Sequence, residues 1–419
     1  MQPEKKKPVL KIILSGYMLV AMVMGFACGL PLLLTITVLQ AWMKEEGVDL
    51  TVIGLMALVG LPYTVKFLWA PLFDRFTLPF LGRRRGWLLI AQIALTLSIA
   101  GLGFSDPVNA PWVLAFAAFL VTFFSASQDI VVDAYRREDL SDEELGLGSS
   151  MYVNGYRMGM LLASGGGLIM ADYMPFSMVY LIMSACMLPG ILTTLLAREP
   201  EVSAGTPRTM KHAVFDPLVD YFTRNGALWM LAFILMYKIG DTMASAMTTP
   251  FYLDIGFSKT EIGTVVKLFG FWATVIGALT GGVIMLRMGI NRALWIFGFL
   301  QAISTAGFAV LARIGYNIPA LSAVIGFENL SSGMGTAAYM AFMASITNKK
   351  FTATQYALLT SLMGVPRVMA SAPTGFFAKH MGWETFFILC ALIAIPGMLL
   401  LLKFAPWNQE KTAEKGIQL

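Results

Sequence analysis

Long apolar runs recur along the whole chain, and each is long enough to cross a lipid bilayer. A membrane-spanning helix needs about 20 mostly apolar residues. The composition agrees, because 57% of the 419 residues are hydrophobic and 13% are charged, whereas soluble domains carry about 25% charged residues. The sequence therefore predicts an all-α membrane protein with twelve transmembrane helices. We place them at residues 14–42, 51–72, 86–105, 111–136, 146–171, 175–197, 226–252, 258–286, 292–314, 318–347, 351–378 and 384–405.

One long connection divides these spans six from six. Residues 198–225 are polar and contain several Pro and Gly residues, which is typical of a linker. The sequence therefore predicts two six-helix bundles, at residues 1–197 and 226–419, joined by this linker.

Basic residues cluster in connections that alternate along the chain. The clusters include Lys5–Lys7, Arg83–Arg85, Arg136–Arg137 and Lys349–Lys350. Because positive charge is retained on the cytoplasmic side, we expect both termini and the linker to be cytoplasmic. The apolar run after the basic start has no small-residue cleavage site, so we expect no cleavable signal peptide.

The two halves of the chain resemble each other. The segment "TVIG" at 51–54 matches "TEIG" at 260–263, and "NGYRMG" at 154–159 places an arginine where "GVPRVM" at 364–369 does. Both matches are offset by about 210 residues, which is half of the chain. Duplicated six-span halves with a site near the bilayer midplane are typical of secondary transporters.

Few residues suit metal binding or covalent chemistry. Cys28, Cys186 and Cys390 all fall inside apolar spans, so we expect no disulfide. The two histidines, His212 and His380, lie in polar connections. We therefore expect no metal, no cofactor other than a proton gradient, and no enzyme activity, since a membrane acyltransferase needs an intramembrane His, a Ser/His pair or a metal.

Two acids at the end of the fourth span have no place against lipid. Asp129 and Asp133 follow Gln128 and share one helix face, because they are four residues apart. Asp129 lies roughly 27 Å along the helix from Pro111, and a lone carboxylate at that depth is a candidate for reversible protonation. A hydrogen bond to a neighbouring helix is the alternative. Asp133 is closer to the surface, where an ion pair with a nearby arginine is the simpler role.

Other charged residues are also predicted within spans, where each must face a cavity or a partner. Glu328 lies roughly 15 Å into its span and is a second candidate proton carrier. Lys238 and Asp241 are three residues apart, so they either neutralise each other or serve substrate and proton. Arg157 and Arg367 occupy matching points of the halves, and either clamp an anionic substrate or tie helices together.

The connection after the second span reads "FDRFTLPFLGRRRG". It resembles the loop signature of the major facilitator superfamily, Gly-x-x-x-Asp-x-x-Gly-Arg-Arg, with about five extra residues between the acid and the glycine. In that family the charges of this loop pair with helix ends and hold the cytoplasmic side shut. The resemblance implies a gating role for Asp74, Arg83, Arg84 and Asp133. The alternative is a positive-inside anchor.

Four further motifs resemble the AmpG-type muropeptide permeases, a branch of the same superfamily that also includes acetyl-CoA transporters. They are "GLPLLLTITVLQAWM", "GRRRGWLL", "SQDIVVDAYR" and "NGYRMGML". Several members carry two additional C-terminal helices beyond the twelve predicted here. The resemblance implies the major facilitator fold and proton-driven import of N-acetylglucosaminyl-1,6-anhydro-N-acetylmuramyl peptides across the bacterial inner membrane. It also implies a part in peptidoglycan recycling, β-lactamase induction and antibiotic resistance, by a monomer that binds no nucleic acid.

The resemblance and the chemistry of such a ligand select two sets of residues. We expect substrate binding at Gly29, Gln128, Tyr156, Arg157, Lys238 and Arg367, with Tyr156 able to stack on a sugar or to serve packing. We expect proton coupling at Asp129, Asp241 and Glu328.

Two other transport functions stay open. A carrier for another anionic solute, such as an acetyl-CoA-like molecule, has the same charge requirements. A drug–proton antiporter of the superfamily would carry Gly-x-x-x-Gly-Pro-x-x-Gly-Gly in its fifth span, whereas this chain reads "GMLLASGGG" without the proline. A channel is disfavoured by the duplicated halves, and saturable, gradient-dependent uptake distinguishes a carrier from it.

Overall fold

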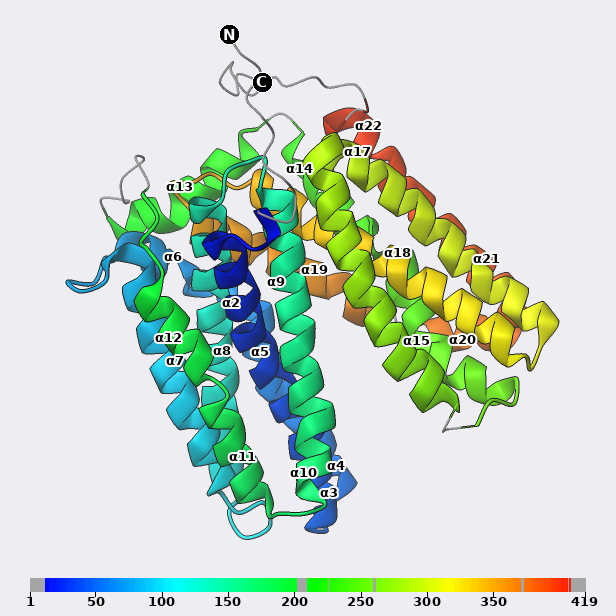
Figure 1. Ribbon diagram of the computed structural model, residues 1–419, viewed down its shortest axis with the longest axis horizontal. Helices are drawn as coiled ribbons and strands as arrows, with labels where there is room; N and C mark the ends of the chain where they lie inside the picture. Colours follow the sequence, from blue (N-terminus) through cyan, green and yellow to red (C-terminus); the bar gives the residue numbers. More distant parts are fainter. Residues whose placement is uncertain are drawn as a thin grey trace. The chain divides into compact units, whose positions relative to one another are not determined.

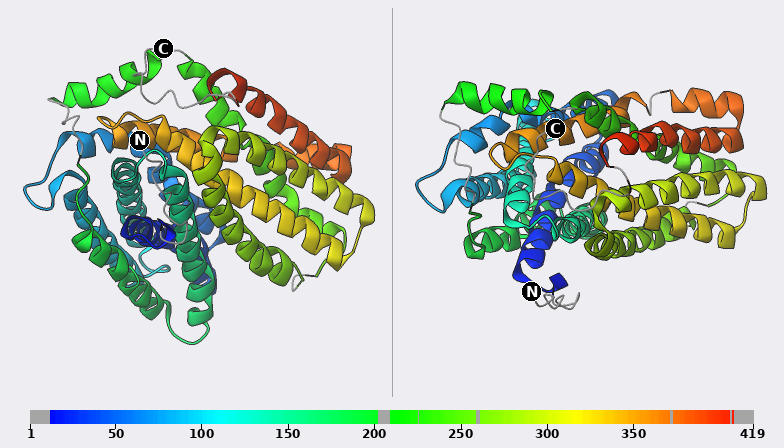
Figure 2. Two further views of the ribbon diagram at one scale, coloured as in Figure 1. Left: turned by 45° about the horizontal axis from the view of Figure 1, so that its top comes forward. Right: turned by 90° about the horizontal axis from the view of Figure 1, so that it is seen from above.

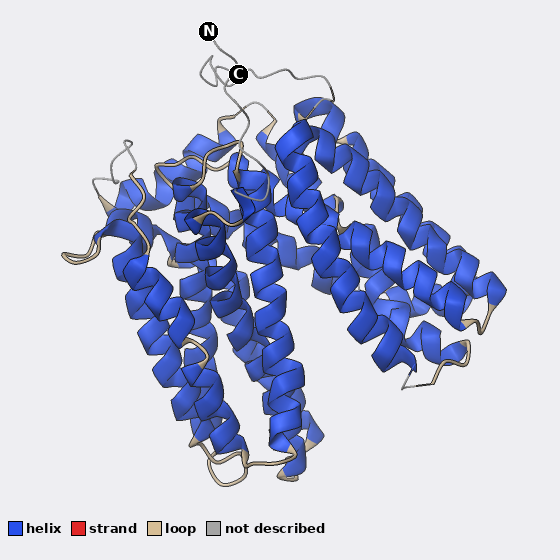
Figure 3. Ribbon diagram, viewed as in Figure 1, coloured by secondary structure: helices blue, strands red, loops and turns tan. Residues whose placement is uncertain are grey.

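The computed structural model describes residues 12–201, 209–224, 226–258, 261–370, 373–405 and 407. Within them every regular element is helical (Figure 3). The internal contacts divide the chain into two units. Unit 1 contains Met1–Pro217 and Ala344–Ser361, and unit 2 contains Leu218–Met343 and Leu362–Leu419.

Unit 1 is a bundle of long helices, several of which are interrupted by short π-helical or 3₁₀ turns (η) (Figure 1). Its elements are α2 (Gly16–Leu33), η1 (Leu34–Val38), α3 (Leu39–Glu45), α4 (Leu50–Leu55), η2 (Met56–Gly60), α5 (Leu61–Val65), η3 (Lys66–Leu68), α6 (Ala70–Arg75), α7 (Gly82–Gly103), α8 (Pro111–Asp139), α9 (Leu145–Leu161), η4 (Leu162–Gly166), α10 (Gly167–Ala171), α11 (Phe176–Ala185) and α12 (Leu188–Leu196).

Unit 2 is a second helical bundle. Its elements are α14 (Ala227–Met236), α15 (Ile239–Asp254), η5 (Ile262–Phe269), α17 (Gly270–Ile314), α18 (Ile318–Ser345), α20 (Thr374–Met381), α21 (Trp383–Leu399) and α22 (Leu401–Phe404). Gly289 breaks α17 with φ of 81°, a left-handed value that favours glycine, so α17 consists of two helices. Three elements cross the boundary between the units: the end of α18, α13 (Met210–Phe222) and α19 (Thr352–Met369).

The twelve predicted spans are all helical in the described residues. Among the described residues, seven helices are long and apolar enough to cross a membrane, and one of them, Ile262–Ile314, covers two predicted spans. The other four predicted spans are also helical, but they are interrupted, as between α4 and η3, or carry more small and polar residues, as in α18 and α19. The prediction of an all-helical membrane protein is confirmed.

The linker contains a helix that the sequence did not predict. Residues 198–225 were expected to be a polar connection, yet α13 occupies Met210–Phe222 despite Pro217. Ala213 and Tyr221 of this helix are buried. Pro217 accepts a hydrogen bond at its carbonyl from Gln355 Nε2 of α19, at 3.0 Å. The helix is therefore held against the first turns of α19.

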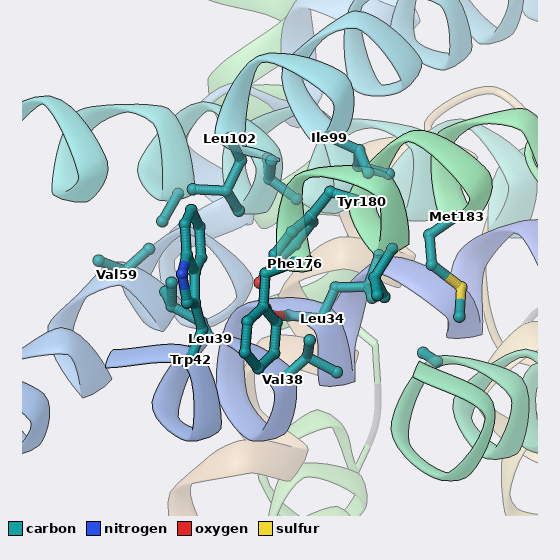
Figure 4. Packing of buried hydrophobic residues seen from close by; sticks show 14 of the residues in the cluster. Leu34, Val38, Leu39, Trp42, Val59, Ile99, Leu102, Phe176, Tyr180 and Met183 are labelled. Atoms are coloured by element: carbon teal, nitrogen blue, oxygen red, sulfur yellow. The ribbon is translucent and has the colours of Figure 1, made fainter. Parts of the chain in front are cut away.

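Unit 1 has an aromatic core in which α3 meets α11. Trp42 of α3 stacks on Phe176 of α11 with ring centroids 5.7 Å apart, and it also contacts Tyr180 (Figure 4). The Tyr180 hydroxyl donates to the carbonyl of Leu34 at 3.0 Å. That carbonyl lies in the π-helical turn η1. Trp42 is therefore a packing residue of this core.

Glycines allow α2 and α9 to lie in direct backbone contact. A Cβ atom built on Gly29 would lie 1.9 Å from the carbonyl oxygen of Tyr156, and one on Gly155 would lie 1.9 Å from that of Met22. No larger side chain fits at such a distance. Gly25 and Gly159 are equally close to the facing helix. This is the close packing that small residues spaced four apart provide in membranes, and it explains Gly29 as a packing residue.

The core of unit 2 is also aromatic. Phe251 of α15 contacts Phe387 of α21 with centroids 4.8 Å apart, and Phe308 of α17 contacts the same ring at 5.1 Å. Gly277 of α17 faces the backbone of Leu330 in α18, where a Cβ would lie 2.1 Å from the carbonyl oxygen. α17 and α18, the helix that carries Glu328, are thereby packed closely together.

Candidate functional site

Asp129 of α8 lies inside unit 1 beside a lysine. Its side chain is 9% exposed, and Asp129 Oδ2 is 3.9 Å from Nζ of Lys66 in η3, whose side chain is 8% exposed. The sequence left open reversible protonation or a hydrogen bond to a neighbouring helix, and it did not identify this ion pair. The residues are 63 positions apart, so no helical spacing signalled the pair. Both charges need this pairing, since neither faces solvent.

The neighbourhood of Asp129 is polar but incompletely hydrogen-bonded. Asp129 Oδ1 and Gln128 Oε1 are buried and have no hydrogen-bond partner among the described residues. Gln128 donates through Nε2 to Cys28 Sγ of α2 at 3.4 Å. Buried polar atoms are almost always satisfied in native proteins. Both oxygens are therefore hydrogen-bond acceptors that the described residues leave unused.

Asp133 continues this polar face toward the end of α8. It forms an ion pair with Arg136 at 3.2 Å, as the sequence predicted. Arg136 also donates to the hydroxyl of Tyr356 in α19 at 2.8 Å and lies 4.4 Å from the ring centroid of Tyr152. All four residues are buried. Arg136 therefore joins the acidic face of α8 to the first part of α19 within unit 1.

Unit 2 contains a second buried acid–base cluster. Lys238 Nζ is 3.0 Å from Asp241 Oδ2 in α15, so the predicted mutual neutralisation is observed. Glu328 of α18 is 8% exposed and interacts electrostatically with Asp241 and Lys238. The three residues therefore form one charge-coupled cluster.

At one end of unit 1, Asp74 is completely buried and binds the first turn of α19. The backbone N–H groups of Ala353 and Thr354 donate to its carboxylate at 3.3 and 2.8 Å, and the Thr354 hydroxyl donates at 2.7 Å. Arg83 and Arg84 lie 3.1 and 2.8 Å from Asp74 Oδ1. A negative charge at a helix N-terminus is favourable, because the free N–H groups point toward it. The acid thus caps α19.

The remaining charges of the loop also satisfy helix ends. Arg84 donates to Glu138 of α8 at 2.9 Å. Arg85 donates to the carbonyl groups of Thr194 and Leu195 at the end of α12, at 2.8 and 2.6 Å. The Glu199 carboxylate accepts hydrogen bonds from backbone N–H groups in the first turn of α7, from Arg84 at 2.7 Å and from Arg85 at 3.0 Å. The expectation that these charges pair with helix ends is met.

Of the remaining predicted substrate residues, Tyr156 of α9 interacts electrostatically with Asp129 and Asp133 of α8. Arg157 is half-buried on α9. Tyr156 lies 6.0 Å from Tyr152 between ring centroids, and its backbone packs against Gly29. Arg367 belongs to α19, but its side chain lies outside the described residues. Their substrate roles stay predictions.

Two helical units with buried acid–base pairs inside apolar helices define a polytopic membrane transporter. A family model described as Major Facilitator Superfamily matches residues 13–371 and 239–417. The anhydromuropeptide permease of Escherichia coli K12 is 45% identical over 91% of this chain and 78% of its own length. The putative transporter AmpG 4 of Rickettsia felis is 31% identical, with 91% and 94% covered. The chain therefore belongs to the major facilitator superfamily and, within it, to the AmpG-type permeases.

Solved structures show the same fold at low sequence identity. The fucose:proton symporter FucP of E. coli has a TM-score of 0.71 at 13% identity, with 93% of this chain and 98% of that chain covered. The proton:xylose symporter XylE has a TM-score of 0.69 at 14% identity, with 96% and 97% covered. The predicted major facilitator fold is confirmed, and the chain is a multi-pass protein of the bacterial inner membrane.

Proposed function

We propose that this chain imports anhydromuropeptides from the periplasm into the cytoplasm, driven by the proton gradient. The observation that carries the proposal is its 45% identity to the E. coli anhydromuropeptide permease over 91% of the chain. The buried acids supply the chemistry that proton coupling needs. The distribution of Lys and Arg supports cytoplasmic termini, and it assigns the end of unit 1 that carries Asp74 to the cytoplasmic side.

In unit 1 the proton acceptor is Asp129. Its Oδ1 has no hydrogen-bond partner within the part of the chain that the structure describes, so a proton is accepted there without breaking a described bond. Protonation removes the negative charge that Lys66 faces at 3.9 Å. Lys66 then becomes an unpaired buried cation, which is costly. Pairing of Lys66 with Asp133 or with an anionic group of the cargo then becomes favourable. Proton binding is thereby linked to cargo binding.

In unit 2 the acceptor is the carboxyl pair of Asp241 and Glu328. Two carboxylates close together do not both stay ionised, so the pair holds a proton readily. Lys238 supplies one positive charge to the pair at 3.0 Å from Asp241. Loading and losing the proton changes the net charge of this buried cluster, and such a change favours one conformation of a carrier over another.

The cargo combines sugars with peptide carboxylates. Arg157 and Arg367 suit the carboxylates, because guanidinium groups bind them bidentately. Tyr156 suits a sugar face, and Gln128 Oε1 is a buried acceptor that no described residue satisfies. Lys238 serves a carboxylate only after it leaves Asp241, so we rank it below the two arginines.

The network around Asp74 serves as the gate of the cytoplasmic side. Asp74 holds the first turn of α19 through two backbone N–H groups and one hydroxyl. Arg83 donates to Asp74 and also to the carbonyl of Lys350 just before that helix, at 3.1 Å each. Opening of this side requires that these bonds break together.

The direct test is uptake of labelled anhydromuropeptide by proteoliposomes containing the purified chain. We expect accumulation above the outside concentration when a proton gradient is imposed, and equilibration only when an uncoupler removes it. Protein-free liposomes are the control. Failure to take up anhydromuropeptide, with uptake of another anion or export of drugs instead, would reject this function.

Variants separate coupling from binding. Asp129→Asn and Glu328→Gln should abolish uphill accumulation while the exchange of labelled for unlabelled cargo continues, because exchange needs no net proton movement. Asp142→Asn is a matched control, since Asp142 is 71% exposed and pairs with Arg137 at the surface. Normal accumulation in both coupling variants would remove the two acids from this role.

A further inference from the structure

The exposed face of α13 is apolar, which is unusual for a helix in a polar linker. Phe215, Val219 and Phe222 are 57%, 58% and 51% exposed. They are spaced at i, i+4 and i+7, so they form one stripe along the helix. The opposite face, with Ala213 and Tyr221, is buried against the protein.

The charged side chains of α13 lie beside the apolar stripe or at its end. Asp216 lies 3.0 Å from His212, and Asp220 pairs with Arg224, so both acids have a partner beside the stripe. Lys211 is exposed at the N-terminal end and forms no ion pair among the described residues. An apolar stripe with a cation at its rim is typical of a helix lying in the interface of a membrane.

The chain itself holds α13 at the level of the membrane surface. Only four residues separate Phe222 from the start of α14 at Ala227, which limits the reach to about 18 Å. Two residues further on, Trp229 is 48% exposed, and Lys403 lies 4.3 Å from its ring centroid. Exposed tryptophan with lysine marks the boundary between lipid and water. Before α13 in the chain, α12 ends with Leu196, whose side chain is 86% exposed.

The ribbon diagram agrees with this placement. Figure 2 draws α13 along the edge of the unit 1 helices instead of over their middle. A helix at the edge of a bundle end is beside the lipid headgroups. A helix over the middle would be surrounded by water and protein.

We propose that the stripe Phe215–Val219–Phe222 of α13 lies in the boundary between headgroups and acyl chains of the bilayer. The occupant of this face is the lipid itself. Since the other face of α13 is hydrogen-bonded to α19 through Gln355 and Pro217 at 3.0 Å, the helix ties the capped end of α19 to the membrane surface.

Spin labelling in liposomes tests the proposal in the full chain. A nitroxide is attached at Val219→Cys, and its collisions with oxygen, which is enriched in lipid, are compared with those of a water-soluble nickel chelate. Val108→Cys is the water-side control, because Val108 is 53% exposed in the turn between α7 and α8. Leu97→Cys in α7, 67% exposed, is the lipid-side control. The chain without an added cysteine gives the background of native cysteines.

We expect the label at Val219 to favour oxygen over the nickel chelate several-fold more than the label at Val108, and to approach the value at Leu97. A ratio equal to that of Val108 would show that the face is in water. Shielding from both reagents would show that protein, for example a second copy, covers it. Either of these results overturns the proposal.

Discussion

Asp74 offers the clearest quantitative prediction, because a single buried carboxylate accepts bonds from five donor groups. Asp74→Asn keeps the shape of the side chain and removes the charge. Loss of one partner of a buried ion pair costs about 3–5 kcal/mol. We take about 3 kcal/mol, since asparagine still accepts one or two of these bonds. A change of 1.4 kcal/mol is tenfold in an equilibrium constant, so opening of the first turn of α19 should become about 100-fold more frequent.

Hydrogen exchange measures this opening directly, because amide exchange follows the local opening equilibrium. In Asp74→Asn, the amides of Ala353 and Thr354 should exchange about 100-fold faster than in the unaltered chain. Asp142→Asn is the control, since its pairing with Arg137 at 2.7 Å is mostly exposed and such pairs contribute about 0–1 kcal/mol. An increase of less than about threefold at Thr354 in Asp74→Asn would refute the reasoning that this acid holds α19.

Three further predictions concern packing and acid sensitivity. Gly155→Val should destabilise the chain by about 1–3 kcal/mol or more, because it forces α2 and α9 apart. Gly101→Val is the control and should have little effect, since no atom lies within 4 Å of a Cβ there. Thermal unfolding in detergent compares the stabilities of the two variants. Trp42→Ala should cost about 3–5 kcal/mol through the cavity it leaves, and the same measurement shows it. The pKa of Asp106 lies below its ordinary value because Asn109 donates backbone and side-chain hydrogen bonds to it. This contribution is present above the unfolded pKa of about 3.9 and is lost as the pH falls through the lowered value, so the exchange protection of the Asn109 amide should be constant at neutral pH and fall in acid.

Hydropathy was sufficient to predict the helices, since apolar length alone decides what spans a bilayer. It was not sufficient to predict their irregular turns. The π-helical turn η5 and the 3₁₀ turns η2 and η3 depend on tertiary packing, which leaves no simple periodic signal. The helix α13 was missed because Pro217 and the flanking polar residues resemble a loop, although the spacing of Phe215, Val219 and Phe222 was visible in the sequence.

Pairs of charges were predictable only where sequence spacing brings them together. Asp133 with Arg136 and Lys238 with Asp241 are three residues apart on one helix, and both pairs were foreseen. Lys66 with Asp129 joins different elements and was not foreseen. The same is true of Glu328 beside Asp241 and of Asp74 at the start of α19. Such contacts depend on how helices pack, which one sequence does not specify.

The account depends on protons and cargo crossing together through buried acids. The most direct measurement records the external pH of weakly buffered proteoliposomes when anhydromuropeptide is added outside. With the unaltered chain, entry of cargo should carry protons inward, so the outside should become more alkaline; Glu328→Gln should show no such change. Accumulation of cargo by the unaltered chain without any alkaline shift, or an undiminished shift with Glu328→Gln, would contradict the account.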